Sequence, residues 1–415
     1  MSTSRINFSA AVRNIIIKRA NNKCSVPRCK NPTMGPSGSD ESINTGVACH
    51  IYSAALNGPR GRGGKSNDFI ESAENGIWCC DKHASLIDKN QGNDYPAETL
   101  FSWKALAEAR TKKLLDDVPS PLGWVDKIEY LRFSHHATLP SIKLSRFSLI
   151  YSGNVSGKSA LLEAAGAISN SLALERFSTS QMHARITYST VDSFSKDVEL
   201  IVDNELIKRI ENDTPCLLPP GDLEVIYLSE RYQYHQEHED DVDFFMRFLG
   251  IDKSTLYALI NPGPYDLLSG TIKLDVVWDY DEEIDTDIKL KKPDGTDYIG
   301  IYFKRDGVNS EYVNYKNLSK SESSRLILGL MLKKAKAISK QRLTFFIVDG
   351  MIYNYDKNNF RKLLEYLTTF DFQVAVVLPY SQETEVLDKT GSAPRLQEHE
   401  YLKPWKLISL QQHKL

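Results

Sequence analysis

Two pairs of zinc-type ligands bracket a short, glycine-rich segment near the start of the chain. The first pair is Cys24 and Cys29, and the second is Cys80 and His83. Each pair fits a tight turn, and together they offer the four ligands of one tetrahedral zinc ion. Because the bracketed segment is too small and glycine-rich to fold on a core of its own, we expect a metal to hold it together.

The bracketed segment also contains residue types suited to phosphodiester chemistry. His50 follows a short apolar run, and Asn75 opens the stretch that closes at Asp88. Hydrolysis of a phosphodiester needs a general base near neutral pH, which histidine supplies. It also needs a hard cation to neutralise the phosphate, and carboxylates bind such cations. These residues therefore point to a nuclease-type site.

About a quarter of the chain, from about residue 20 to about residue 103, resembles HNH endonucleases of the ββα-metal class. The resemblance is to a subgroup with the pattern AHI, GPRG, NGIWLCxxC and LID, which reads CHI, GPRG, NGIWCCDKH and LID here. It implies that His50 activates water, that Asn75 orients His50, and that Asp88 and His50 bind a catalytic Mg²⁺ or Mn²⁺ ion. One departure is Ala84, where many relatives carry a histidine ligand.

A different interpretation of the same module stays open, in which it binds nucleic acid without cutting it. Arg60, Arg62 and Lys65 lie among glycines and are suited to phosphate contacts, although such loops are often only solvated. Cys79 adjoins Cys80, and we expect it to pack inward as a small hydrophobic residue.

Composition limits the classes of protein to which this chain can belong. A length of 415 residues predicts two or three domains, and the net charge of −3 means that DNA contacts must come from local patches. There is no apolar run of transmembrane length and no signal peptide, so we expect no membrane contact. The six cysteines, gathered mainly around the zinc bracket, suggest metal use in a reducing cytoplasm.

A domain boundary is expected after a helix over residues 97–115, whose apolar spacing includes Leu100, Trp103 and Leu106. Two prolines, a serine and a glycine follow it. We therefore predict an N-terminal module over 1–118, a linker over 119–123 and a second domain over 124–415.

The second domain begins with the pattern of a phosphate-binding loop. An apolar strand over 147–151 runs into a glycine-containing loop and then an apolar helix. Backbone amides at the helix start would cradle phosphates, a lysine would reach the β- and γ-phosphates, and a serine would hold Mg²⁺. The residues expected to bind the nucleotide here are Gly153, Asn154, Gly157, Lys158 and Ser159.

Two later segments complete a resemblance to ABC-type ATPases of the SMC and RecF kind. The run 318–322, which contains Ser319 and Ser321, resembles their signature motif and opens a helix to about residue 338. The apolar run 343–349 ends at Asp349, as a Walker B strand does. The intervening residues form no heptads, so no long coiled coil is expected. Residues 318–324 also fit a simple helix N-cap.

Departures from the ATPase pattern favour nucleotide binding over hydrolysis. Gly350 follows Asp349 where a hydrolysing enzyme carries glutamate, and Ser321 replaces a signature glycine. We expect ATP to be bound with slow or absent turnover. The resemblance implies that two heads sandwich ATP, with Ser319 and Ser321 completing the partner's site, which gives a homodimer or a higher even oligomer.

The predicted fold class is α+β, with a zinc-stapled ββα-metal HNH module followed by an α/β ABC-type P-loop head. The pairing of domains resembles the Septu type of bacterial anti-phage system, in which an additional defence partner is conceivable. The predicted function is metal-dependent cleavage of double-stranded DNA, regulated by ATP. Two alternatives are a DNA-binding ATPase whose zinc module does not cut, and a regulatory assembly whose head recruits another protein.

Overall fold

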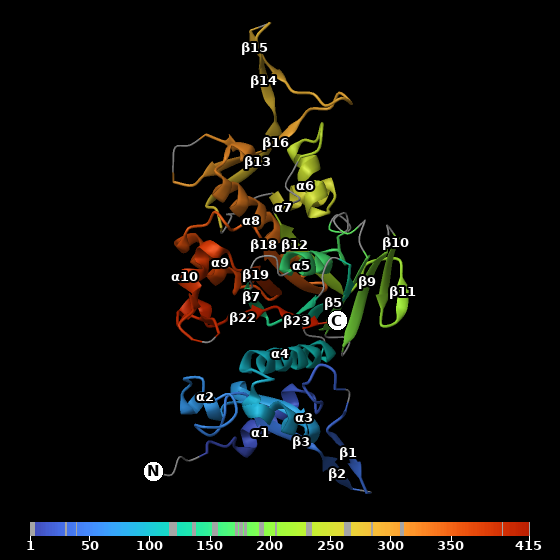
Figure 1. The fold of residues 1–415 in the computed structure, drawn as a ribbon, viewed down its shortest axis with the longest axis vertical. Coiled ribbons are helices and arrows are strands. Elements are labelled where there is room, and N and C mark those ends of the chain that lie inside the picture. Colours follow the sequence, from blue (N-terminus) through green and yellow to red (C-terminus); the bar gives the residue numbers. More distant parts are fainter. Residues whose placement is uncertain are drawn as a thin grey trace.

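The structure is a computed structural model in which three parts follow one another along the long axis (Figure 1). The zinc-ligand module lies at one end, a larger mixed α/β head lies in the middle, and a β-hairpin projects from the other end. The residues described are 5–29, 31–38, 40–115, 123–134, 138–151, 157–170, 173, 177, 181–190, 195–203, 206–229, 235–260, 267–283, 285–307, 311–391 and 393–414. The predicted linker at 119–123 therefore lies almost entirely outside them.

The N-terminal module is built around two short antiparallel strands followed by a helix. Strands β3 (Gly46–His50) and β4 (Gly76–Cys80) pair so that His50 faces Gly76, and α3 (Asp81–Ile87) follows at once. The segment between the strands carries the glycine-rich loop. The other elements of the module are α1 (Ala10–Arg19), β1 (Met34–Ser37), β2 (Glu41–Asn44), α2 (Asn67–Glu71), η1 (Ala73–Asn75) and η2 (Lys89–Gly92).

Helix α4 (Ala97–Leu114) lies between this module and the head (Figure 1). It confirms the helix expected from the apolar spacing, and Leu100 and Leu106 on it are fully buried. Farther along, the guanidinium of Arg110 donates two hydrogen bonds of 3.0 Å to the carbonyl oxygen of Thr190 in the head. The helix is thus a direct mechanical link between the two parts.

The centre of the head is a five-stranded parallel sheet in the order β12-β18-β19-β7-β22. Parallel sheets are covered on both faces, and the strands accordingly read as continuous apolar runs. The strands predicted at 147–151 and 343–349 are confirmed as β7 and β18. The bounds are β7 (Phe147–Tyr151), β12 (Leu223–Ser229), β18 (Leu343–Asp349), β19 (Gln373–Val377) and β22 (Lys406–Ser409).

A seven-stranded antiparallel sheet, in the order β11-β10-β9-β8-β5-β6-β23, packs with α5 (Lys158–Gly166) on one face of the parallel sheet. Its last strand, β23, comes from the C-terminal end, next to β22 of the other sheet. The tail after residue 382, which offered no functional signal in the sequence, thus completes both sheets. The bounds are β5 (Gly123–Phe133), β6 (Thr138–Lys143), β8 (Gln181–Thr190), β9 (Lys196–Asp203), β10 (Leu206–Glu211), β11 (Thr214–Cys216) and β23 (Gln411–Lys414).

Helices cover the other face of the parallel sheet, with the long helix α8 (Lys320–Ile338) at its centre. The other helices that contribute to this core are α6 (Asp241–Leu249), α7 (Lys253–Ile260), α9 (Lys357–Leu367) and α10 (Glu383–Val386). None of the helices within the described ranges is long and apolar enough to cross a membrane. The short elements nearby are η5 (Tyr315–Asn317), η6 (Tyr380–Gln382), β20 (Leu387–Asp388), β21 (Arg395–Leu396) and η7 (Glu400–Leu402).

The projecting part is a small sheet extended by a hairpin (Figure 1). Strand β16 pairs with β13 and β17, and β14 pairs with β15 at the tip. No coiled coil is found in the described residues between the phosphate-loop region and α8, as the absence of heptads predicted. The bounds are β13 (Gly270–Val276), β14 (Trp278–Asp281), β15 (Thr286–Lys289), β16 (Ile299–Arg305) and β17 (Val313–Asn314).

One ionisable group at the base of the head predicts a pH dependence of stability. Burial raises the pKa of Asp126 to about 6, although the charges of Arg28 and Arg110 oppose the shift. The same side chain ionises near pH 3.9 in an unfolded chain, so folding loses stability as the pH rises from about 4 to about 6. We expect Asp126→Asn to raise the unfolding temperature at pH 8 and to give no gain at pH 4. Thermal unfolding at both pH values, with the exposed Asp287→Asn as control, checks this. An equal gain at both pH values would contradict it.

Candidate functional site

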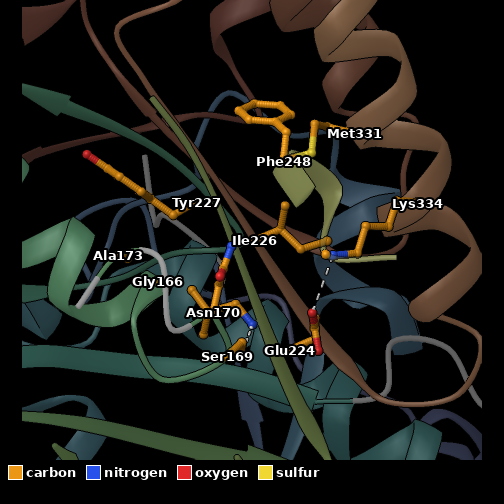
Figure 2. Close-up of a pocket in the computed structure, with 12 residues that line it drawn as sticks. Gly166, Ser169, Asn170, Ala173, Glu224, Ile226, Tyr227, Phe248, Met331 and Lys334 are labelled. Atoms are coloured by element: carbon orange, nitrogen blue, oxygen red, sulfur yellow. Dashed lines mark hydrogen bonds and ion pairs between the residues drawn. The ribbon is translucent and has the colours of Figure 1, made fainter. Parts of the chain in front are cut away.

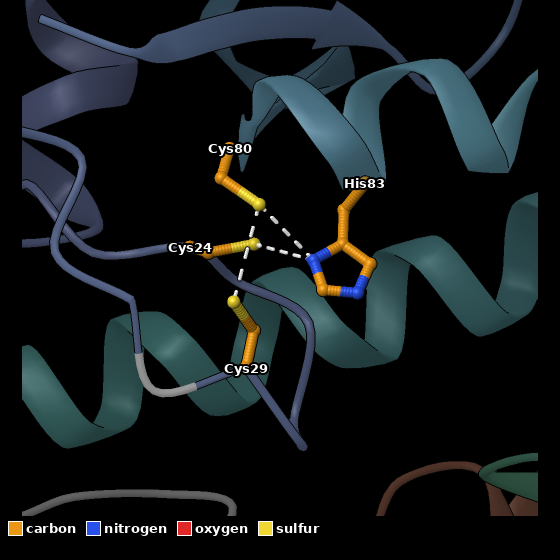
Figure 3. Close-up of side chains that lie close together, drawn as sticks. All are labelled: Cys24, Cys29, Cys80 and His83. Carbon is orange, nitrogen blue, oxygen red and sulfur yellow. Dashed lines mark hydrogen bonds between the residues drawn. The ribbon is translucent and has the colours of Figure 1, made fainter.

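The four predicted zinc ligands come together in the structure (Figure 3). One ligand atom from each of Cys24, Cys29, Cys80 and His83 lies within 4.8 Å of all the others. His83 Nδ1 is 3.2 Å from the sulfur of Cys80 and 3.6 Å from that of Cys24, and the sulfurs of Cys29 and Cys80 are 4.0 Å apart. Ligand atoms around a tetrahedral zinc lie roughly 3.5 to 3.8 Å apart, so the cluster fits this ion.

Local structure explains why these four residues meet. Cys80 is the N-cap of α3, which puts His83 one helical turn further on, on the same side. The first pair lies in the turn after α1, and a backbone hydrogen bond of 2.8 Å from Ser25 to Trp78 ties that turn to β4. The spacing of each pair is thus set locally, and the pairing of the turn with β4 brings the pairs together.

The thiols of the cluster differ in how readily they ionise. A hydrogen bond from Cys79 lowers the pKa of Cys24 to about 5, whereas burial raises the pKa of Cys29 to about 12. Zinc binds the thiolate form of cysteine. Cys79 is fully buried, which confirms that it packs inward.

A second site lies next to this cluster. His50, at the end of β3, and Asp88, directly after α3, line one pocket of about 320 Å³, called here the His50 pocket. Arg5, Arg60 and Ala84 also line it. The structure therefore brings together two of the three predicted catalytic residues. Ala84 contributes no ligand at the position where the resembled nucleases carry histidine.

The environment of His50 keeps it neutral. Its ring stacks on Phe8 with 3.7 Å between the centroids, and its Nε2 atom is buried without a hydrogen-bond partner among the described residues. Burial, assisted by the charge of Arg5, lowers the pKa of His50 to about 4. A neutral imidazole can accept a proton at pH 7, although a pKa this low makes it a weak base.

Asn75 acts on the backbone next to His50 and not on its ring. The side chain, fully buried, accepts a hydrogen bond of 2.8 Å from the Tyr52 amide and donates to the carbonyl oxygens of Tyr52 and Ile70. Its own carbonyl accepts from the Ile51 amide at 2.8 Å. Any orienting effect of Asn75 on His50 is therefore transmitted through the two residues that follow the histidine.

We expect Asn75→Ala to destabilise the N-terminal module because it leaves three buried backbone groups without partners. Each such loss costs about 1 kcal/mol or more, so the free energy of unfolding should fall by roughly 3 kcal/mol. Urea denaturation measures the change, and the exposed Asn31→Ala serves as control. A loss no larger than that of the control would show that the three hydrogen bonds are not needed for stability.

Arg60 connects the two predicted catalytic residues and points inward. Its guanidinium donates to the carbonyl oxygens of Ile51 at 2.7 Å, Ile87 at 2.6 Å and His50 at 3.3 Å, and pairs with Asp88 at 2.6 Å. The side chain is only 5% exposed. Arg60 thus braces the ends of β3 and α3 as a positioning residue. The sequence showed only an arginine among glycines, a pattern that suggested phosphate contact.

Backbone strain accompanies this brace. Arg60 has a φ of 62°, a left-handed conformation that residues other than glycine rarely adopt. Its side chain packs over Gly92, where an added Cβ would lie 2.5 Å from the Arg60 Nη1 atom. Strain of this kind persists only where the surrounding structure enforces it, and it is often found at functional sites.

The donor atoms of the His50 pocket can hold a divalent ion that retains most of its water. The buried Nε2 of His50 has no partner, and Asp88 has a second carboxylate oxygen besides the one held by Arg60. Mg²⁺ and Mn²⁺ tolerate such a water-rich shell. However, one imidazole nitrogen cannot bind a metal and accept a proton at once, so Asp88 is the better ligand if His50 is the base.

The predicted nucleotide-site residues that the structure describes lie at the start of helix α5, at the carboxyl edge of the parallel sheet. Gly157 is the N-cap with a φ of 80°, and Lys158 and Ser159 form the first turn. The backbone amides of such a turn attract phosphate. Gly153 and Asn154 lie outside the described residues. A left-handed N-cap explains why glycine is needed at position 157.

Asp349 lies at the same edge of the sheet, at the end of β18, which is separated from β7 by strand β19. It is 4% exposed and accepts a hydrogen bond of 2.9 Å from the hydroxyl of Tyr227. Tyr227 also packs under α5, where a Cβ on Gly166 would lie 2.5 Å from the Cβ of Tyr227. Figure 2 shows Tyr227 and Gly166 beside a small cavity of about 150 Å³, whose lining does not include Lys158.

The residue after Asp349 is unsuited to a catalytic carboxylate. Gly350 has a φ of 114°, a conformation open essentially to glycine alone. A glutamate at this position would strain the backbone. The backbone conformation of this turn therefore disfavours a glutamate at position 350.

Ser319 and Ser321 lie at the start of α8. Ser319 is the N-cap and forms a capping box with Glu322, in which each residue satisfies a backbone amide of the other. This bears out the interpretation of residues 318–324 as a helix N-cap. Among the described hydrogen bonds, none joins Ser319 or Ser321 to the turn that begins at Lys158.

Comparison with known proteins identifies structural likeness only. No protein-family model matches the sequence, and no curated protein does either. Among solved structures, the chain is similar to an SMC head bound to the C-winged helix domain of ScpA, with 12% identity, a TM-score of 0.41, and coverage of 70% of this chain and 98% of that one. It is also similar to the SMC head domain from Thermotoga maritima, with 13% identity, a TM-score of 0.35, and coverage of 66% and 99%. A RecF–ATP structure gives 13% identity, a TM-score of 0.40, and coverage of 64% and 95%.

Proposed function

We propose that this protein is a DNA endonuclease whose cutting is regulated by ATP bound to its head domain. The observation that carries the proposal is the His50 pocket. His50 and Asp88 come from the ends of β3 and α3, line one pocket, and are braced by Arg60 beside a cluster that fits zinc. The resemblance to HNH endonucleases implies a base at His50 and a metal ligand at Asp88, and the common pocket of these two residues supports the proposal.

In the proposed reaction, neutral His50 takes a proton from a water molecule as the water oxygen attacks phosphorus. The bond between phosphorus and one ester oxygen then breaks, and the leaving oxygen gains a proton from solvent. Arg60 holds His50 and Asp88 in place through the backbone of β3 and the Asp88 carboxylate. A divalent ion held by Asp88 would neutralise the phosphate charge. Zinc at the cysteine cluster would be structural.

The head supplies the regulation in this proposal. Lys158 and Ser159 would bind ATP and its Mg²⁺, and Asp349 at the same sheet edge would help to hold the ion. Because Gly350 leaves no catalytic carboxylate, bound ATP would persist. Ser319 and Ser321 of a second copy would close over it, and α4 would transmit pairing of the heads to the nuclease module. A role in anti-phage defence, alone or with a further partner, fits a nuclease restrained or released by ATP.

The test is a plasmid-cutting assay with the full chain and Mg²⁺ or Mn²⁺, in which ATP is titrated from zero to millimolar concentrations. We expect wild type to cut, ATP to change the rate, and His50→Ala to reduce it by a factor of about 100 to 10,000. The exposed His238→Ala is the matched control. Equal cutting by wild type and His50→Ala would refute the assignment of the base.

A second candidate function is DNA binding without cutting. Two observations favour it: Ala84 supplies no metal ligand, and the carboxylate of Asp88 is already paired with a buried guanidinium at 2.6 Å. In that case DNA would bind, no ATP concentration would give cutting, and His50→Ala would leave binding intact. The plasmid assay, combined with a binding measurement, separates the two functions.

A further inference from the structure

The basic residues of the chain are distributed unevenly, although its net charge is slightly negative. The chain has 51 lysines and arginines against 54 acidic residues. By contrast, the first 39 residues contain no aspartate or glutamate. The basic residues in this stretch are Arg5, Arg13, Lys18, Arg19, Lys23, Arg28 and Lys30.

Close packing places this basic stretch beside the His50 pocket. Ile16 of α1 contacts β4 at Gly76, where an added Cβ would lie 2.2 Å from the Ile16 Cδ1 atom. Gly76 is the residue that pairs with His50 across the two strands. Phe8, just before α1, stacks on the His50 ring. The absence of a side chain at residue 76 therefore lets α1 lie directly against the catalytic strand pair.

Two exposed residues of α1 carry charges that form no ion pair with the rest of the described chain. Arg13 and Lys18 are exposed, and neither forms an ion pair within the described part of the chain. Arg19, by contrast, is paired with Glu108 at 2.6 Å. Arg5 lines the His50 pocket itself, and the charges of Arg5 and Arg13 both act on His50. Arg13 on the surface of α1 and Arg5 in the pocket thus place positive charge both outside and inside the His50 pocket.

We propose that the exposed basic residues of α1, together with Arg5, bind the sugar–phosphate backbone of duplex DNA and guide one phosphate into the His50 pocket. The proposal rests on the proposed function, since it names how the substrate of that site is held. Exposed, unpaired lysines and arginines bind DNA through its phosphates, without reading the sequence. The interaction should therefore be strongly dependent on salt.

The test is duplex binding by the full chain without added Mg²⁺ or Mn²⁺, so that a metal-dependent enzyme cannot cut. No chelator is added, because it would remove zinc from the cysteine cluster. Fluorescence anisotropy with a labelled duplex would be recorded over about 50 to about 300 mM KCl for wild type and for Arg13→Gln/Lys18→Gln. Glutamine keeps the helix propensity of the replaced residues. The matched control is Arg361→Gln/Lys362→Gln, which removes two exposed charges from α9 of the head.

We expect the α1 variant to bind about tenfold more weakly and its salt slope to fall by about 2, because each lost phosphate contact contributes about 0.9. The α9 variant should match wild type. An α1 variant with unchanged affinity and slope would overturn the proposal. If that variant instead lost self-association in sedimentation, α1 would be assigned to a protein contact.

The outcomes also separate this inference from the proposed function. DNA binding that depends on α1, without cutting under any condition, would keep the inference and refute the nuclease. If the α1 variant cuts at the wild-type rate and binds with the wild-type affinity, the nuclease proposal stands and the inference about α1 is refuted. A wild-type chain that binds no duplex DNA would refute both.

Discussion

Replacing Cys80 by serine should abolish zinc binding and unfold the N-terminal module while the head stays folded. Cys80 supplies a thiolate to the cluster and caps α3, which follows it directly. Structural zinc contributes about 10 to 16 kcal/mol to the folding of zinc-finger peptides, and this small module has only a modest apolar core to replace it. We expect the largest loss of stability of any single substitution in the chain.

Metal analysis and calorimetry check this prediction. Wild type should contain one zinc per chain. Cys80→Ser should contain none and should keep the unfolding transition of the head while it loses that of the N-terminal module. Cys216→Ser is the control, since Cys216 lies on β11, outside the cluster. A Cys80→Ser variant with full zinc content, or with an unchanged transition, would show that the cluster does not bind zinc as a structural ion.

Replacing Lys158 by alanine should weaken ATP binding by a factor of about 100 or more. The ammonium group at the start of α5 would form charge-assisted hydrogen bonds with the phosphates, each worth about 1.5 to 3 kcal/mol. The fold should not change, because Lys158 is only partly buried in the first helical turn. If ATP bridges two heads, the variant should also lose ATP-dependent association.

Calorimetric titration with ATP and Mg²⁺ measures the affinity, and sedimentation with and without ATP measures the association. Lys340→Ala, an exposed lysine beyond the end of α8, is the control. An unchanged affinity in Lys158→Ala would refute the phosphate-loop assignment. Lost affinity without any change in association would refute only the idea that ATP joins two heads.

The sequence alone determined the features that depend on short-range patterns. The spacing within Cys24–Cys29 and within Cys80–His83 predicted two ligand pairs, and the structure brings them into one cluster. Apolar runs predicted β7 and β18, and apolar periodicity predicted α4. These predictions hold because such features depend on residues that are close together in the sequence. Hydrogen bonds in a turn or helix, and the burial of both faces of a strand, leave a local pattern of residue types.

How the pocket residues act depends on contacts between elements that are distant in the sequence. The sequence does not show that Arg60 turns inward to hold His50 and Asp88, because its partners lie on two separate elements. Nor does it show that Asn75 bonds to the backbone after His50, or that Phe8 covers the His50 ring. These contacts join residues that are far apart in the chain, so no local sequence pattern predicts them. They form because α1, β3, β4 and α3 pack closely against one another.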